Sequence, residues 1–509
     1  MLSKIFSASV LGLEGYGVEI EVDVGGGIPA VAVVGLPDTA VKESKERVKS
    51  ALKNSQFDYP PRKITVNLAP ADIKKEGPIF DLPIALGIIS ATGQMNSERL
   101  KEFIIIGELA LNGEIRRVKG VLPIALSLRK SPFKKIILPQ DNAAEAGIVE
   151  EIEAYPVRTL SEAVAFLEGK IEISPYRIER EDLLKGLGDY EVDFSEVKGQ
   201  EFVKRALEIS ASGYHNLLML GPPGAGKTML AKRLPTILPE MTREECLETT
   251  QIYSVAGLLP PNQALITRRP FRMVHHTASD IALVGGGAVP KPGEISLAHN
   301  GVLFLDELPE FHRDTLEVLR QPLEEGQITI SRASRSLTFF SRFLLCATMN
   351  PCPCGYFGSS RECHCTPRKI QQYRAKISGP LLDRIDIHIE VPALKYKELL
   401  GKNEGEPSSE IRKRVNRARK IQLRRFKNTG INFNSQMSSR LIKKFCQLEE
   451  SSQELLKRAI DELGISARGY DKILKVARTI ADLAGSENIL TEHIAEAIQY
   501  RSLDRNLWI

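Results

Sequence analysis

Hydrophobic and polar residues alternate in several short runs near the start of the chain, and this pattern predicts β-strands with one buried face. The clearest apolar or alternating runs are residues 30–34, 63–68, 103–106 and 135–138. The apolar stretch from Ile5 to Leu13 resembles the beginning of a secretion signal, but it continues directly into Glu14 and a second alternating run. We therefore predict a first strand there. Amphipathic helical stretches separate the runs, so we expect residues 1–171 to form an α+β domain.

The rest of the chain falls into two further blocks with different patterns. A charged segment at residues 172–194 is interpreted as a linker, and short apolar strands then alternate with helices over residues 195–395. This alternation is typical of a parallel sheet that carries helices on its faces. Residues 396–509 are almost entirely helix-patterned, for example at 453–461, 471–484 and 491–501. We expect an α/β core followed by a helical domain.

The amino-acid composition limits the classes of protein to which the chain can belong. Of the 509 residues, 42% are hydrophobic and 26% are charged, as in ordinary globular proteins. No run approaches the ~18 consecutive apolar residues that a membrane-spanning helix needs, so we expect no membrane contact. Seven cysteines, four of them within residues 352–365, do not make a disulfide framework, and a reducing, cytoplasmic location is expected.

Positive charge is concentrated late in the chain, although the net charge is only +5. Nine Lys and Arg residues lie between Arg412 and Lys427, with no acidic residue among them. Ile411, Val415 and Ala418 would share one face of a helix in this segment. The pattern favours a solvated helix over a direct DNA contact, although so dense a charge can attract a polyanion.

The strongest motif is a glycine-rich loop between an apolar strand and a helix. It has the form GxxxxGK(S/T) and consists of Gly221, Pro222, Pro223, Gly224, Ala225, Gly226, Lys227 and Thr228. Glycines let backbone N–H groups surround phosphates, and the start of the following helix adds positive potential. Lys227 should reach the β- and γ-phosphates of ATP, and the Thr228 hydroxyl should bind Mg²⁺. The strand–loop–helix context favours this interpretation over a glycine-rich turn with a chance lysine.

A second apolar strand, residues 301–305, ends in two adjacent carboxylates, Asp306 and Glu307. Acidic residues directly after a buried strand make poor structural sense unless they meet a cation or a reacting group. We expect Asp306 to hold Mg²⁺ and Glu307 to polarise the attacking water. A merely structural acidic strand end is the alternative.

Together with two further segments, these motifs resemble the magnesium-chelatase-like AAA+ ATPases. The segments are residues 275–287, which begin with two histidines and end in three glycines, and residues 292–310, which include the acidic pair. The resemblance covers all three blocks, and the order of the parts is similar to that of the ComM/YifB family, a group of bacterial DNA branch-migration motors. A general AAA+ protein would share only the phosphate loop and the acidic strand end.

The resemblance implies roles for five further residues. Asn350, at the end of an apolar strand, resembles a sensor that helps to place the attacking water. Arg384 resembles an arginine finger directed at the γ-phosphate in the neighbouring subunit. Arg468 resembles a second sensor that acts within its own subunit, and Gly199 with Gln200 resembles a motif beside the adenine. For both arginines, a surface salt bridge remains the alternative.

Two short cysteine pairs, Cys352 with Cys354 and Cys363 with Cys365, flank a loop that contains two glycines. Four thiolates at this spacing can supply the tetrahedral geometry that Zn²⁺ prefers, so we expect structural zinc within residues 352–365. The CxC spacing is tighter than the commoner CxxC, and reduced thiols on a surface loop are the alternative.

Two alternating strands, residues 327–331 and 337–341, are joined by a segment that contains Arg332 and Arg335. It resembles a hairpin that faces the central pore in ring-shaped members, where both arginines would contact DNA phosphates. The Gly- and Pro-rich residues 285–299, with Lys291, resemble a second pore-facing insertion. A solvated hairpin tip is the alternative.

In the first block, residues 74–78 and 107–114 resemble the Lon protease domain, which has a ribosomal protein S5 domain 2-like fold. Lon uses a Ser–Lys dyad whose serine directly follows a Gly-Pro pair. Here Ile79 occupies that position, and residues 120–124, where the lysine would fall, contain none. We expect the fold without the proteolytic chemistry.

The overall prediction is an α/β AAA+ P-loop NTPase core with a helical lid, preceded by an inactive Lon-like domain. The leading function is ATP-driven movement on single-stranded or branched DNA by a homo-oligomeric ring, expected to be a hexamer, in recombination or natural transformation. One alternative is the ATPase subunit of a magnesium-porphyrin chelatase, against which the Lon-like domain argues. Another is a nucleotide-binding clamp without turnover, against which the complete hydrolytic set argues.

Overall fold

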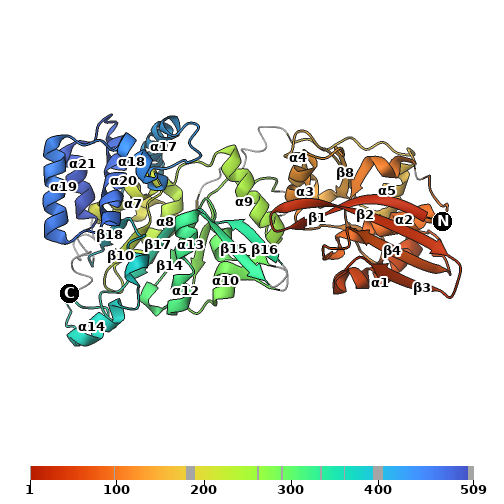
Figure 1. The fold of residues 1–509 in the computed structure, drawn as a ribbon, viewed down its shortest axis with the longest axis horizontal. Helices are drawn as coiled ribbons and strands as arrows, with labels where there is room; N and C mark the ends of the chain where they lie inside the picture. The colour runs from red at the N-terminus through yellow and green to blue at the C-terminus, as the bar shows by residue number, and fades with distance from the viewer. Residues whose placement is uncertain are drawn as a thin grey trace. The chain divides into compact units, whose positions relative to one another are not determined.

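The computed structural model describes residues 2–96, 98–178, 190–260, 263–287, 290–332, 335–359, 361–393 and 405–501. Contacts divide the chain into two compact units (Figure 1). The first comprises residues 1–187, 243–267 and 331–339, and the second comprises residues 188–242, 268–330 and 340–509.

The first unit is built on a mixed seven-stranded sheet in the order β3-β4-β2-β1-β5-β8-β9. Its strands are β1 (Leu2–Leu11), β2 (Glu14–Gly25), β3 (Ala30–Val34), β4 (Lys63–Ala69), β5 (Phe103–Ile105), β8 (Lys135–Pro139) and β9 (Glu153–Val157). Strand β1 pairs antiparallel with β2, so Ile5 lies opposite Ile20, and both side chains are fully buried. The predicted first strand and the four alternating runs are therefore confirmed.

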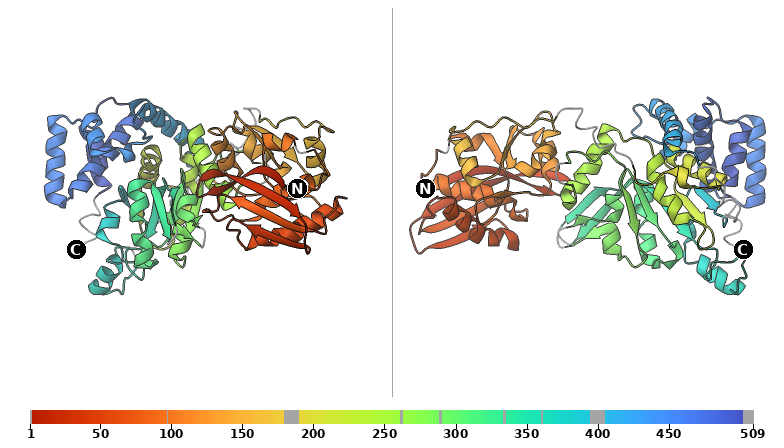
Figure 2. Two further views of the ribbon diagram at one scale, coloured as in Figure 1. Left: turned by 45° about the vertical axis from the view of Figure 1, so that its right-hand side comes forward. Right: turned by 180° about the vertical axis from the view of Figure 1, so that it is seen from behind.

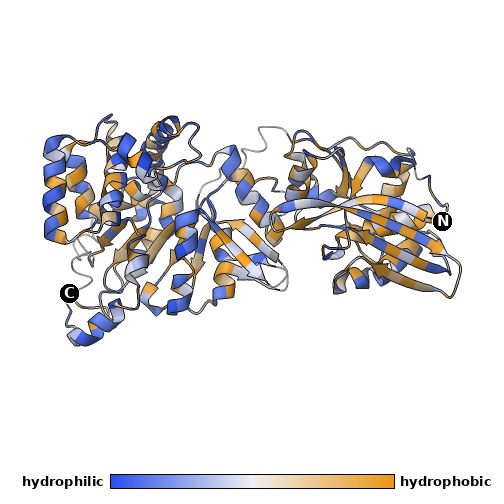
Figure 3. Ribbon diagram, viewed as in Figure 1, coloured by the Kyte–Doolittle hydropathy of each residue, from blue (hydrophilic) through white to orange (hydrophobic). Residues whose placement is uncertain are grey.

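Helices cover the apolar face of this sheet. They are α1 (Thr39–Asn54), α2 (Asp81–Ala91), α3 (Val121–Leu128), α4 (Ala143–Gly147) and α5 (Leu160–Leu167), and a small ribbon is formed by β6 (Glu108–Leu109) and β7 (Ile115–Arg116). Helices α2 and α3 pack on β1 and β2. Along β4 the alternate residues Ile64, Val66 and Leu68 are fully buried, which is the period-two pattern visible in the strand colours of Figure 3.

Helix α9 (Arg243–Ala256) belongs to the first unit, although the sequence places it within the core block. It packs on α3, where the backbone N–H of Gly120 donates to Ser254 O over 3.1 Å. The buried Glu145 carboxylate accepts hydrogen bonds from the Ser254 hydroxyl and from the Leu122 N–H. This network links segments more than a hundred residues apart, so no local pattern predicts it.

The second unit contains a five-stranded, fully parallel sheet in the order β11-β14-β17-β10-β18. Its strands are β10 (Leu217–Leu220), β11 (Phe271–Val274), β14 (Val302–Leu305), β17 (Leu344–Met349) and β18 (Ile387–Glu390). Every residue of β10, β14 and β17 is buried, as expected when helices cover both faces of a parallel sheet. The predicted α/β core is confirmed.

Helices α7 (Glu201–Gly213) and α8 (Lys227–Ile237) flank β10, and shorter elements complete the core. These are α10 (Asp280–Val284), α11 (Glu294–Leu297), α12 (Arg313–Glu317), α13 (Arg320–Glu325), α14 (Pro367–Arg374) and α15 (Gly379–Leu382). The predicted hairpin consists of β15 (Gln327–Arg332) and β16 (Arg335–Phe340). The glycine-rich insertion contains the short ribbon β12 (Gly285–Gly286) and β13 (Lys291–Pro292).

The C-terminal part is helical, as predicted. It contains α17 (Ser408–Arg425), α18 (Ser439–Phe445), α19 (Glu450–Leu463), α20 (Ala467–Ala484) and α21 (Thr491–Gln499) (Figure 2). Helices α17 and α20 pack on α7, and their buried residues share one hydrophobic core with β10 and β18. No helix in the described part of the chain is long and apolar enough to cross a bilayer.

The predicted linker is visible only at its ends, because residues 179–189 lie outside the described ranges. At one end, the Tyr176 N–H donates to Ala154 O of β9 over 2.7 Å. At the other end, Phe194 is fully buried in the core of the second unit. The described residues before position 179 are thus bound to the first unit, and those from position 190 onwards are bound to the second unit.

Candidate nucleotide site

The glycine-rich loop follows the carboxyl end of β10, and α8 begins at Lys227. Gly224 and Gly226 have φ values of +79° and +86°, which favour glycine, and this conformation leaves the backbone N–H groups at the helix start free to bind an anion. At Gly221, a Cβ would lie 2.3 Å from Val391 O, so no larger residue fits. The backbone therefore has the form of a phosphate-binding loop.

Lys227 lies within this loop and is only 9% exposed. Its Nζ donates to Gly221 O over 2.5 Å, to Pro222 O over 3.0 Å and to Asn350 Oδ1 over 3.1 Å. Burial lowers the pKa of Lys227 below its usual value, while the carboxylates of Asp306 and Glu307 oppose that shift. The ammonium group is thus held beside the place where the loop would receive phosphates.

Oxygen ligands suited to Mg²⁺ meet next to the lysine. The Thr228 hydroxyl donates to Asp306 Oδ2 over 2.9 Å, and the Thr348 hydroxyl donates to Asp306 Oδ1. In nucleotide sites, Mg²⁺ commonly binds a hydroxyl at the start of a helix and a carboxylate at the end of a neighbouring strand. The donor set therefore fits this ion, with Thr228 and Asp306 as the residues that would hold it.

Glu307 has a strained backbone, with φ of +54° in the left-handed region. Its N–H donates to the Thr348 hydroxyl over 3.1 Å, which holds this conformation. The carboxylate is half exposed and lies 3.9 Å from His276 Nδ1. A carboxylate turned towards solvent beside the metal ligands can orient a water molecule for attack.

Gln200 contacts the phosphate loop, and Gly199 directly precedes Gln200. Both adopt positive φ, and the Gln200 side-chain amide donates to Ala225 O over 2.9 Å and to Pro392 O over 3.3 Å. A cavity of about 550 Å³ adjoins them, lined among others by Phe202, His388 and Pro392. Such a cavity can receive a nucleoside next to the phosphates.

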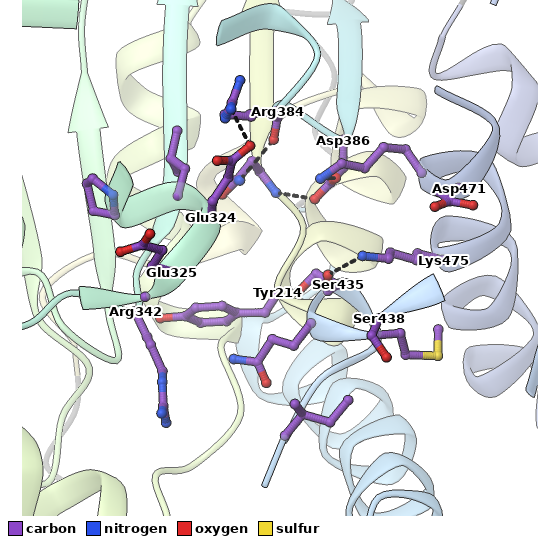
Figure 4. Close-up of a pocket in the computed structure, with 18 of the residues that line it drawn as sticks. Tyr214, Glu324, Glu325, Arg342, Arg384, Asp386, Ser435, Ser438, Asp471 and Lys475 are labelled. Atoms are coloured by element: carbon purple, nitrogen blue, oxygen red, sulfur yellow. Dashed lines mark hydrogen bonds and ion pairs between the residues drawn. The ribbon is translucent and has the colours of Figure 1, made fainter. Parts of the chain in front are cut away.

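Arg384 and Arg468 lie at a different edge of the sheet. Arg384 donates to Glu324, and Arg468 lies 4.0 Å from the same carboxylate. Both line a cavity of about 590 Å³ together with Asn216, Phe343 and Asp386, the residues that directly precede β10, β17 and β18. Figure 4 shows Arg384, Glu324 and Asp386 in this cavity. The cavity therefore opens at the amino ends of these parallel strands.

The phosphate loop lies at the carboxyl ends of the same strands, which a four-residue strand separates from the amino ends by about 13 Å. Action of Arg468 on the nucleotide of its own subunit does not fit this position. Arg468 lies in the first turn of α20, which Ser466 caps by accepting a hydrogen bond from the Gly469 N–H. The motif did not predict where α20 lies in the fold.

The amino-edge cavity also contains a buried ion pair. Asp386 is 1% exposed and pairs with Lys472 and with His215. Burial acts to raise the pKa of Asp386, but the Lys472 ammonium and His215 outweigh it and hold the pKa well below its usual range. The Asn216 N–H donates to the same carboxylate over 3.0 Å. This network fastens α20 to the strand ends.

The four cysteines of the predicted zinc loop meet in one cluster. Their sulfur atoms all lie within 4.8 Å of one another, and a metal ion can bind there. The Phe357 N–H donates to Cys352 Sγ over 3.4 Å. The backbone N–H of Tyr356 and the neighbouring Cys352 thiol lower the pKa of Cys354 to about 6, which favours a thiolate at neutral pH. Cys246, Cys346 and Cys446 are buried elsewhere.

Arg332 is the last residue of β15 and Arg335 is the first residue of β16, next to the undescribed residues 333 and 334. Lys291 lies in the β13 strand and is exposed. The roles of these three residues as DNA contacts stay predictions.

The basic residues of α17, and of the segment directly after it, fall into two groups. Arg412, Arg414, Arg419 and Arg425 are taken up by internal hydrogen bonds and ion pairs, for example with Glu208 and Asp482. Lys413, Arg417, Lys420 and Arg424 of α17 are exposed, as is Lys427, which follows the end of the helix. Spacings of four, three and four residues place the four helical members in one row, and together with Lys427 we name them the α17 stripe. Within the described residues, only Lys413 of this row has an acidic partner, Glu410.

The candidate site of the Lon-like domain contains no nucleophile where the resemblance would require one. Ile79 occupies that position, and its side chain is apolar and only 6% exposed. Nearby, Arg47 holds the buried Asp81 in an ion pair of 2.7 Å, and burial raises the pKa of Asp81 to about 6 despite this partner. The Lon-like identity of this domain stays a prediction.

Sequence reasoning missed Thr348 and His276. Thr348 holds both Asp306 and the backbone of Glu307, and His276 approaches the Glu307 carboxylate. A polar side chain inside the apolar run Leu344–Met349 was an available signal for Thr348. His276 could be linked to the acidic pair only through the pairing of β11 with β14.

A phosphate loop, an acidic pair and a polar residue at three neighbouring strand ends of a five-stranded parallel sheet define a P-loop AAA+ ATPase. Three family models match the chain: "Magnesium chelatase, subunit ChlI" over residues 193–399, "Subunit ChlI of Mg-chelatase" over 20–142, and "Magnesium chelatase, subunit ChlI C-terminal" over 405–501.

Similarity to curated proteins extends along the whole chain. The chain is 46% identical to the competence protein ComM of Haemophilus influenzae, over 99% of this chain and 98% of that protein. It is 44% identical to YifB of Escherichia coli over the same shares. A magnesium-chelatase 38 kDa subunit of Cereibacter sphaeroides is 25% identical over 31% of this chain and 52% of its own length. The chain therefore belongs to the ComM/YifB family of magnesium-chelatase-like AAA+ ATPases.

Proposed function

We propose that this protein is an ATP-driven ring motor that moves along DNA and migrates branched junctions during recombination or natural transformation. The observation that carries this proposal is the full-length similarity to a protein named for competence. Similarity to the magnesium-chelatase subunit reaches only 31% of the chain, so it supports the ATPase core alone.

Hydrolysis is assigned to the residues gathered at the carboxyl edge. Lys227 would bind the β- and γ-phosphates, while Thr228 and Asp306 would hold Mg²⁺, which neutralises charge on the phosphates. Glu307 would orient the attacking water, and Asn350, already bonded to Lys227, would help to fix its position. Gly199 and Gln200 would border the adenine.

The two arginines at the amino edge support the proposal of a ring. Arg384 and Arg468 lie too far from their own phosphate loop to act on it, but each can serve the nucleotide of a neighbouring subunit. An arginine supplied in this way stabilises the transition-state charge and is worth about 10³–10⁵ in rate. We therefore propose a homo-oligomeric ring, with a hexamer as the expected size.

DNA contact is assigned to two places. The β15–β16 hairpin, with Arg332 and Arg335, and the insertion with Lys291 are proposed to face the pore. The α17 stripe is proposed as a second contact, because its cations are exposed and largely without acidic partners among the described residues. From residue 413 to residue 424 the helical part of the row extends about 17 Å, which matches about five phosphates of one B-DNA strand.

The experiment that tests this function compares activators of ATP hydrolysis. Steady-state turnover is measured with single-stranded DNA, with branched DNA and with protoporphyrin. A DNA motor is stimulated by DNA and unaffected by the porphyrin. The magnesium-porphyrin chelatase alternative predicts the reverse result.

The four-cysteine cluster is assigned to one Zn²⁺ per chain, with Cys352, Cys354, Cys363 and Cys365 as ligands. Zinc with thiolate ligands is tetrahedral in structural sites, and the Zn–S distance of about 2.3 Å implies sulfur–sulfur separations of about 3.8 Å. The three separations that involve Cys352, Cys354 and Cys363 are 3.3, 3.6 and 3.7 Å. This agreement supports the assignment.

A further inference from the structure

The cysteine cluster is joined directly to the nucleotide site. Asn350 stands at the end of β17 and accepts the hydrogen bond from Lys227, and Cys352 follows only two residues later. Cys352 is fully buried, and it is the one ligand connected to Asn350 through a single residue, Pro351. A displacement of Cys352 must therefore move the backbone that carries the Asn350 side chain.

The loop also touches the phosphate loop itself. Gly355 has φ of +85°, and a Cβ at this position would lie 2.6 Å from Cδ of Pro223. The backbone of the cysteine loop is thus packed against the turn that precedes Gly224. The Gly355 N–H donates to Cys352 O over 2.9 Å, so this contact depends on the turn around the first two ligands.

Helix α14 contacts the residue that joins Asn350 to Cys352. Arg374 Nε of this helix donates to Pro351 O over 3.2 Å. The Arg374 guanidinium also lies over the Phe357 ring, 5.5 Å from its centre. Because Cys365 lies two residues before α14, a metal bound by all four thiols would tie this helix to the β17 end.

From these contacts we propose that the metal-bound cysteine loop is a positioning device for ATP hydrolysis. The metal holds Asn350 and the Pro223 turn in the geometry that turnover requires, and Arg374 transmits this constraint through Pro351. Removal of the metal then lowers kcat more than it weakens nucleotide binding, because the backbone N–H groups and Lys227 that bind phosphate remain. The inference rests on the ATPase part of the proposed function and requires no DNA.

The test measures ATP hydrolysis without DNA before and after metal removal. Zinc is extracted with a mercurial and a chelator, both are removed, and turnover is assayed with Mg²⁺ present. We expect kcat to fall about tenfold or more, KM and ADP affinity to change less than about threefold, and added Zn²⁺ to restore the rate. A folded, zinc-free protein with unchanged kcat overturns the inference. An equal loss of ADP affinity also overturns it.

Substitutions separate positioning from folding. Cys363→Ser/Cys365→Ser should reproduce the effect of metal removal, whereas Cys246→Ala/Cys446→Ala removes two thiols outside the cluster and should leave kcat and zinc content unchanged. Because the loss of two ligands can unfold the loop, Arg374→Gln supplies a variant that keeps all four ligands.

Arg374→Gln should bind one zinc per chain and lose about fivefold in kcat with KM nearly unchanged. Arg368→Gln, an exposed position on the same helix, is its matched control. Full activity in Arg374→Gln contradicts the inference, even if the zinc-free protein unfolds. Since every assay omits DNA, failure here leaves the DNA-motor proposal standing, and failure of DNA stimulation leaves this test unaffected.

Discussion

Arg384 lies beside Arg468 at the amino edge of the core sheet, where both guanidinium groups approach the carboxylate of Glu324. One arginine comes from the loop after α15 and the other from the first turn of α20, so core and C-terminal helices meet at this carboxylate. The two residues therefore form one positively charged edge that can face the nucleotide of another subunit.

The position of Arg384 predicts complementation between two inactive variants. Arg384→Ala and Lys227→Ala should each hydrolyse ATP at less than about 1% of the normal rate, since an arginine finger is worth about 10³-fold or more. Mixed rings would contain some interfaces with an intact finger and an intact phosphate loop, so part of the activity should return. The measurement is steady-state turnover of mixtures shown to co-assemble. Mixtures that stay inactive contradict an arginine acting between subunits.

Glu307→Gln should separate binding from turnover. The amide keeps the shape of the side chain but cannot polarise water, so kcat should fall about 10²–10³-fold while ATP affinity stays within a factor of three. Fluorescent-nucleotide binding and phosphate release measure the two quantities. Glu310→Gln, an exposed carboxylate three residues later, is the matched control. Normal hydrolysis by Glu307→Gln would remove this residue from the mechanism.

The α17 stripe predicts a salt-dependent DNA contact. Replacing Arg417, Lys420, Arg424 and Lys427 by Gln should weaken DNA binding and reduce the slope of log K against log salt by about 3.6, because each lost phosphate contact contributes about 0.9. Basal ATPase activity should be unchanged. The control replaces Arg440, Lys443, Lys444 and Lys457, which are also exposed, and alters net charge equally. Equal loss of affinity in both variants indicates that only net charge matters.

Asp386 predicts a pH-dependent stability. Its pKa in the folded protein is held below the unfolded value of about 4, so its contribution is present above that pH and is lost as the pH falls through the folded pKa. Asp386→Asn should therefore lower the free energy of unfolding by about 3 kcal/mol at pH 7 and flatten the acid side of the stability curve. Denaturant unfolding from pH 3 to 7 measures this. Asp461→Asn, an exposed position, should have little effect, and an unchanged acid limb in Asp386→Asn contradicts the assignment.

Much of the architecture could be predicted from local patterns. Alternation predicted β3 at Ala30–Val34, and the glycine-rich motif predicted where α8 begins, because both depend on neighbouring residues. The division of the basic run in α17 could not be predicted. Arg414 and Arg425 are neutralised by Glu208 and Asp482, which are distant in the sequence.

The position of Arg468 was missed for a related reason. A motif specifies the first turn of α20, but packing of that helix on α7 decides which edge of the sheet the arginine reaches. The same holds for α9, which joins the first unit through the buried Glu145. The chemistry of a local motif can be predicted from the sequence, whereas the partners of buried charges depend on the assembled fold.

The most direct measurement of the central claim follows a labelled four-way DNA junction in time. With ATP and Mg²⁺, the protein should convert the junction into two duplexes, and it should fail to do so with a non-hydrolysable ATP analogue or with Glu307→Gln, although both should still bind the junction. Conversion that needs no hydrolysis contradicts a motor. A junction that is neither bound at low salt nor processed, while a porphyrin or another protein stimulates the ATPase, contradicts the assignment of DNA as its track.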